Sequence, residues 1–283
     1  MRLFLIVAIL IFNLEAKSLF SNSEQADSSV YIGSLKDLVI ATQKTRGLTN
    51  SYLNGNTAAL LLVYANRQEM KKAIGIMESL PMAADPVINS RATTISQSLI
   101  RLNNKAFKQK PSVAFSNYTE QIGQALMLAQ TVSKRSAKEL NPFGQEASAV
   151  MMEIMLPMTE YVGQLRGFGS GLAAKGRRSE DELAKVLVLV NEVKTLNIKL
   201  QSGMNKLISK YPAKLASSIT AEGSAINKNA SSYTKFAQSN FTKNIKNIDP
   251  NTYFENGTQL ISKIIKAYNT INSAILEDSK GWL

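Results

Sequence analysis

Apolar residues recur every three to four positions along almost the whole chain, which is the spacing of one face of an α-helix. The alternation typical of β-strands is almost absent. Clusters of proline, glycine and asparagine interrupt the pattern and mark helix ends. The pattern predicts eight helices, over residues 28–53, 57–82, 87–109, 112–140, 145–175, 180–210, 213–243 and 252–277.

Asn141-Pro142-Phe143-Gly144 is the strongest interruption, and it leaves four predicted helices on each side. We therefore expect an all-α fold of two stacked or interleaved four-helix bundles, with an internal repeat. The domain spans residues 28–283, with one half over 28–140 and the other over 144–280. Pro157 lies inside a predicted helix and should kink it or break it locally.

The chain contains no histidine and no cysteine. Their absence excludes Ser-His-Asp and Cys-His nucleophiles, His or thiolate zinc sites, disulfides and iron–sulfur ligation. No carboxylate pair stands in a polar, glycine-rich loop. We therefore expect neither an enzyme nor a metal or cofactor site.

The first sixteen residues resemble a secretory signal peptide. Arg2 precedes an apolar run over residues 3–12, and Ala16 is the best candidate for the cleavage position. The run is too short to span a bilayer, which needs about 20 apolar residues, so we expect a soluble periplasmic protein. The net charge of +12 is scattered along the helices, so nucleic acid is not the expected partner.

A shift of 120 residues aligns the first long helix of each half. Arg46-Gly47 then coincides with Arg166-Gly167, and a large apolar residue follows each pair. Few other residues are identical, so the internal repeat depends on this match and on the equal order of elements in the two halves.

Both arginines occupy inward positions of an apolar seam with heptad spacing. A buried guanidinium needs a carboxylate, several carbonyls or an anion. Hydroxyls and glycines, including Thr42, Thr49 and Gly167, surround the arginines in sequence, which favours a small planar anion held by two guanidinium forks. A buried Arg–Glu pair is the alternative, but Glu160, six residues before Arg166, faces another side of that helix.

Three segments resemble the nitrate- and nitrite-sensing (NIT) domain family, namely residues 43–49, residues 163–169, and residues 249–254 with Thr258 and Ile261. The resemblance implies an all-α double bundle that binds nitrate or nitrite between helices, with Arg46 and Arg166 as anion ligands. Thr42 and Thr49 are weaker candidates as hydroxyl donors. Lys228 and Lys235 share one helix face and are weaker candidates as added positive charge, although a solvated lysine is the simpler interpretation of each.

The sequence thus predicts a periplasmic nitrate or nitrite sensor that signals to a membrane-bound sensor kinase or chemoreceptor, and a homodimer is compatible with it. Two alternatives remain open at this point. One is a structural or adhesive helical protein of the envelope, and the other is a chemoreceptor-like sensor domain for another small anion.

Overall fold

A computed structural model describes the backbone of residues 2–243 and 245–280, and the side chains of residues 24–243 and 245–279. Within these ranges every regular element is helical and no strand occurs. Most helices begin at a proline or after a capping side chain, as helix N-termini favour. Ser179 caps the helix that begins at Glu180, in a capping box with Glu182.

The first half of the chain forms four long helices; a short loop follows the first of them, and a 3₁₀ turn follows each of the other three. They are α1 (Arg2–Leu53), α2 (Ala59–Ser79), α3 (Pro86–Lys105) and α4 (Pro111–Ser136), with 3₁₀ turns at Pro81–Ala84, Ala106–Lys108 and Ala137–Glu139.

The second half contains α5 (Pro142–Val150), a π-helical turn (Met151–Met155), α6 (Leu156–Lys175), α7 (Glu180–Lys210), α8 (Ser218–Lys243), a 3₁₀ turn (Ile245–Asn247) and α9 (Pro250–Lys280). Because the π-helical turn joins α5 to α6 without a loop, this half also has four long helical rods among the described residues.

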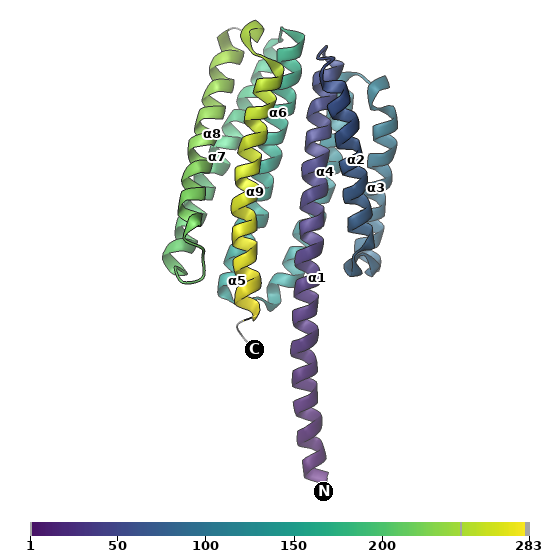
Figure 1. The fold of residues 1–283 in the computed structure, drawn as a ribbon, viewed down its shortest axis with the longest axis vertical. Coiled ribbons are helices and arrows are strands. Elements are labelled where there is room, and N and C mark those ends of the chain that lie inside the picture. The colour runs from purple at the N-terminus through teal and green to yellow at the C-terminus, as the bar shows by residue number, and fades with distance from the viewer. Residues whose placement is uncertain (1, 244, 281–283) are drawn as a thin grey trace.

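The two halves form four-helix bundles that lie side by side, with their helices roughly parallel to one long axis (Figure 1). In the first bundle α1 packs against α2 and α4, and in the second α6 packs against α7 and α9. The main joint between the bundles is the packing of α1 on α6. The predicted all-α architecture is therefore confirmed.

Two predicted helix starts are wrong. The first helix begins at Arg2 and not at Ser28, because neither proline nor glycine interrupts residues 2–27. It extends beyond the bundles at one end of the molecule (Figure 1). The seventh predicted helix begins at Ser218 rather than at 213. The side chains of the predicted signal peptide lie outside the described residues, so cleavage after Ala16 stays a prediction.

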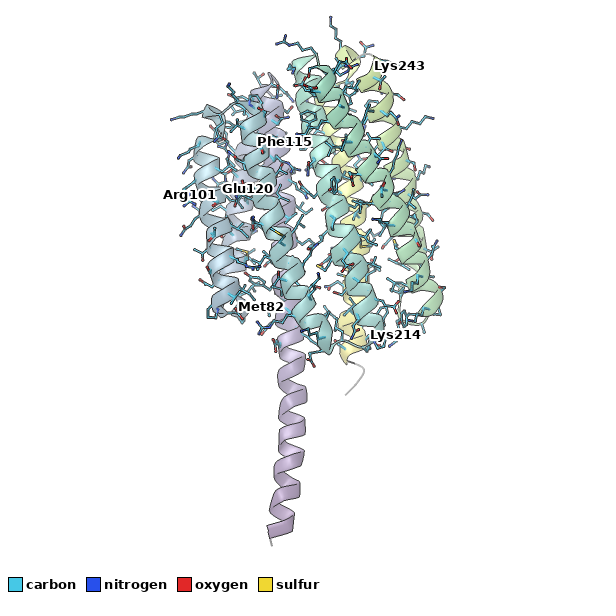
Figure 2. All side chains as sticks on the ribbon, turned by 180° about the vertical axis from the view of Figure 1, so that it is seen from behind. Met82, Arg101, Phe115, Glu120, Lys214 and Lys243 are labelled. Carbon is cyan, nitrogen blue, oxygen red and sulfur yellow. The ribbon has the colours of Figure 1, made fainter. Side chains whose placement is uncertain are left out.

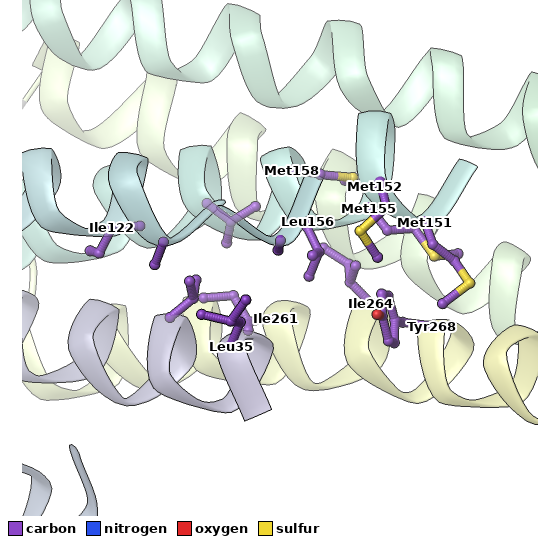
Figure 3. Packing of buried hydrophobic residues seen from close by; sticks show 14 of the residues in the cluster. Leu35, Ile122, Met151, Met152, Met155, Leu156, Met158, Ile261, Ile264 and Tyr268 are labelled. Carbon is purple, nitrogen blue, oxygen red and sulfur yellow. The ribbon is translucent and has the colours of Figure 1, made fainter. Parts of the chain in front are cut away.

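The break expected near Pro157 is a π-helical turn immediately before it, at Met151–Met155. Proline has no backbone N–H, so it cannot donate to the carbonyl one turn earlier, and a π-turn accommodates that loss. The turn points Met151, Met152 and Met155 into the core, where they lie near Tyr268 of α9 (Figure 3). Unbranched methionines fit the irregular space beside such a turn.

Among the described residues, no helix is both long enough and apolar enough to cross a bilayer.

Candidate functional site

The closest approach of α1 to α6 occurs at a pair of glycines. A Cβ atom added at Gly167 would lie 2.7 Å from the Cα of Gly47, so only glycine fits there. A Cβ atom at Gly163 would lie 3.2 Å from Nη2 of Arg46. The glycines therefore permit close contact between α1 and α6, and this contact places both arginines at one crossing.

Arg46 is completely buried and forms an ion pair with a carboxylate from the other bundle. Its Nη1 and Nη2 donate to the two Glu160 oxygens at 2.5 and 3.2 Å, and Nη1 also donates to Thr119 Oγ1 at 2.9 Å. The guanidinium carbon lies 4.8 Å from the centre of the Phe115 ring. Phe115 lies on α4, in the part of the bundles distant from the N-terminal extension of α1 (Figure 2).

The expectation that Arg46 lacks a carboxylate partner is wrong. The prediction considered acids near each arginine in the same helix, and Glu160 indeed does not pair with Arg166. However, it faces α1 across the helix crossing, where it forms a buried ion pair with Arg46. Gln164, one turn further along α6, also donates to Glu160, at 2.9 Å.

Arg166 is almost as buried, at 2% exposure, but it forms no ion pair with any described residue. Its Nη1 donates to Thr258 Oγ1 at 2.9 Å, and its guanidinium carbon lies 4.4 Å from the centre of the Phe254 ring. Nε and Nη2 are buried without any acceptor. These two nitrogens form one edge of the guanidinium group, whose parallel N–H bonds suit two oxygens of one anion.

Burial lowers the pKa of Arg166 to about 10, and the charge of Arg46 adds to this effect. The two cations are therefore close enough to repel each other. The hydroxyl of Tyr233 is a second buried group without a partner. It lies beside the Arg166 side chain, because a Cβ atom at Gly257 would lie 2.8 Å from both Tyr233 Oη and Arg166 Cβ. The Tyr233 hydroxyl thus lies beside the aliphatic part of the Arg166 side chain, with Tyr253 as its other neighbour.

The sequence prediction missed the residues that hold the two guanidinium groups. The pattern Phe-x-Asn-x-Thr occurs at residues 115–119 in α4 and again at residues 254–258 in α9. In each copy the phenylalanine lies against the guanidinium and the threonine accepts from Nη1. A search for short motifs shared by the two halves would have found this pattern.

Lys185 of α7 was missed as well. Its ammonium lies 4.7 Å from the centre of the Phe168 ring and 5.4 Å from that of Phe115. Burial, followed by the nearby charge of Arg46, lowers the pKa of Lys185. It therefore adds a third positive charge close to the crossing.

The weaker candidates from the sequence lie away from the free edge of Arg166. Thr42 donates its hydroxyl to the carbonyl of Leu38 at 2.7 Å. Thr49 is buried with an unpartnered hydroxyl, but the groups beside it are on α2 and α4. Lys228 and Lys235 are exposed on α8, whereas both arginines are buried. The structure brings Arg46, Arg166 and Gly167 together, and it does not bring either lysine to them.

No group of metal-binding side chains occurs in the part of the chain that the structure describes.

Comparison with known proteins gives a family and a fold. A family model described as nitrate and nitrite sensing matches residues 37–279. A solved structure, that of the NasR transcription antiterminator, is similar with a TM-score of 0.64 and 13% sequence identity over 97% of this chain and 74% of that chain. At this identity the likeness concerns the fold. No match was found among curated proteins.

Proposed function

The chain belongs to the nitrate- and nitrite-sensing family, and from that premise we propose that it is a sensor whose anion binds at the crossing of α1 and α6. The free edge of Arg166 is the observation that carries the proposal. Nitrate and nitrite each offer two coplanar oxygens, which match the parallel N–H groups of Nε and Nη2. The Tyr233 hydroxyl supplies a third donor, and Phe254 covers one face of the guanidinium.

Arg46 is the second cation of the proposed site, and Glu160 holds it. An anion that enters the crossing meets Arg166 first, because both terminal nitrogens of Arg46 already donate to a carboxylate. The anion can contact the terminal nitrogens of Arg46 only if Glu160 gives up its hydrogen bonds to them. Such an exchange would alter the α1–α6 joint, since Arg46 and Glu160 lie on its two sides.

The proposed signal is a change in the packing of the two bundles. A ligand shifts a conformational equilibrium only by its difference in affinity for the two states. At this joint the difference would arise from the ion pair between Arg46 and Glu160. We propose a periplasmic protein that presents the altered surface to a membrane partner such as a sensor kinase. Fractionation of cells and the N-terminal mass of the mature protein test the location, for which a start at Lys17 is expected.

Isothermal titration calorimetry of the folded protein tests the binding itself. We expect nitrate or nitrite to bind at about micromolar affinity, and chloride to bind far more weakly because a single spherical atom cannot accept along two parallel N–H bonds. Arg166→Ala should abolish the micromolar binding while circular dichroism shows unchanged helicity.

Arg166→Lys is the matched control, because it keeps the charge and removes the fork. It should lose most of the affinity as well. The absence of heat with both anions, on well-folded wild-type protein, would refute the proposal.

A further inference from the structure

A third arginine, which is partly exposed, has buried guanidinium nitrogens in the first bundle. Arg67 lies in α2 between Val63 and Met70, which are both fully buried, and the spacing of four and three residues places all three on one seam. This is the criterion that identifies Arg46 and Arg166. The sequence prediction did not apply it to the second helix.

Arg67 has the same free edge as Arg166. Its Nε and Nη2 are buried and have no acceptor, and it forms no ion pair with any residue whose side chain is described. The guanidinium carbon lies 4.1 Å from the centre of the Phe107 ring and 5.8 Å from that of Tyr64. The rings cover the cation without supplying an acceptor in the plane of its N–H bonds.

Two hydroxyl groups border this edge. Thr49 is 1% exposed, and its Oγ1 has no partner. Tyr118 is completely buried and donates to Asn103 Oδ1 at 2.7 Å. Burial raises the pKa of Tyr118, while the charge of Arg67 and hydrogen bonding from the Arg67 and Thr49 side chains lower it, so these three side chains face one another. A cation with two free donors, an unpaired hydroxyl and a nearby phenol thus converge between α1, α2 and α4.

We propose that Arg67 is the centre of a second anion site, which binds a small planar monovalent oxyanion such as nitrate or formate. Two oxygens of the anion accept from Nε and Nη2, and the Thr49 hydroxyl donates to it. The class is monovalent because Arg67 is the one cation, among the described residues, whose charge acts on Tyr118. The class is small because the two donor nitrogens are buried and aromatic rings lie over the guanidinium group.

The second site has its own guanidinium group and its own aromatic ring. Arg46 and Arg166 lie on Phe115 and Phe254, whereas Arg67 lies on Phe107, which packs in the same apolar cluster as Phe254. Thr49, which the sequence associates with Arg46, belongs to the Arg67 group instead. The second site therefore does not depend on the proposed sensor site.

Calorimetry and thermal-shift titrations with nitrate, and separately with formate, test this proposal in the Arg166→Ala variant. We expect residual binding of one equivalent at about millimolar affinity. Arg67→Ala should abolish that binding, and Arg67→Lys should weaken it at least tenfold because the fork is lost. Thr49→Val should weaken it several-fold. Arg101→Ala, an exposed arginine on α3, is the matched control and should leave it unchanged (Figure 2).

The outcomes separate the two proposals. If Arg166→Ala binds neither anion at tens of millimolar, the Arg67 site is refuted and the sensor site stands. If the wild type binds no nitrate at the crossing, yet Arg67-dependent binding persists, the sensor proposal fails alone. Should the Arg67 variants unfold, NMR of arginine Nε–H groups in the Arg166→Ala variant provides the answer. The Arg67 resonance must shift on titration, and an unmoved resonance overturns the proposal.

Discussion

The candidate site has two halves, one around Arg46 and one around Arg166. The packing around the two arginines is almost the same, but only the charge of Arg46 is balanced by a carboxylate. In both halves an Arg-Gly pair lies on the helix crossing, a phenylalanine lies on the guanidinium, and a threonine accepts from Nη1 at 2.9 Å. The difference is one carboxylate. Glu160 occupies the Arg46 half, whereas no acidic side chain of the described residues pairs with Arg166.

The difference shows how one helix crossing can combine stability with readiness to bind. A buried ion pair keeps α1 and α6 in register, while the unpaired cation beside it keeps its attraction for an external anion. The free guanidinium edge is a cost to the ligand-free fold, because buried donors without acceptors are unfavourable. A bound anion would remove that cost.

The largest expected effect is a difference in unfolding free energy between alanine variants of the two arginines. Arg46→Ala leaves Glu160 buried without its partner and should lower the free energy of unfolding by about 3–5 kcal/mol. Arg166→Ala removes an unpaired charge and should change it far less. Urea unfolding followed by circular dichroism measures both. Equal losses would contradict the comparison, and adding Glu160→Ala to Arg46→Ala should recover much of the loss.

The second effect concerns the crossing that both halves share. Gly167→Ala places a methyl group 2.7 Å from the Gly47 Cα, so α1 and α6 must separate. We expect a loss of about 1–3 kcal/mol in unfolding free energy from this overpacking, together with weaker nitrate binding. Gly75→Ala, where a Cβ atom meets nothing within 4 Å, is the matched control and should keep nitrate affinity. Unchanged nitrate affinity in Gly167→Ala would show that binding does not depend on the close contact between α1 and α6.

The third effect makes the Arg46 half resemble the Arg166 half, by removing the charge of the carboxylate. Glu160→Gln removes the negative charge that competes for Arg46, so nitrate affinity should rise about tenfold, equivalent to about 1.4 kcal/mol. The variant should be less stable than the wild type without nitrate, and nitrate should raise its melting temperature more than that of the wild type. Calorimetry and thermal shift measure the two quantities. An affinity at or below that of the wild type would mean that Arg46 takes no part in binding.

The smallest effect is the response to pH. The chain has no histidine, and burial lowers the pKa of Arg166 only to about 10. The anion binds the protonated guanidinium, so affinity should stay level between about pH 6 and pH 9 and should fall about tenfold per unit above pH 10. Calorimetry across this range checks the profile, with circular dichroism to confirm folding. A midpoint near neutral pH would exclude Arg166 as the titrating group.

Much of the fold follows from periodicity, because amphipathic seams and proline or glycine breaks are local signals. The burial of Arg46 and Arg166 follows from the same seams. The partner of Arg46 could not be predicted in this way, since Glu160 approaches it from another helix and only the crossing geometry brings them together. Arg67 could have been predicted from the sequence, because the spacing of buried positions around it is as regular as that around the other two arginines.

The π-helical turn at Met151–Met155 has a consequence for where Arg166 points. A π-turn contains one residue more than an α-helical turn, and each residue of an α-helix advances the side-chain direction by about 100°. Every residue of α6 is therefore offset in phase from the direction that α5 alone would give. The direction of the Arg166 side chain is thus determined more than ten positions upstream. Any rearrangement that moves the extra residue along the helix past Arg166 would turn this side chain away from Phe254 and Thr258 of α9.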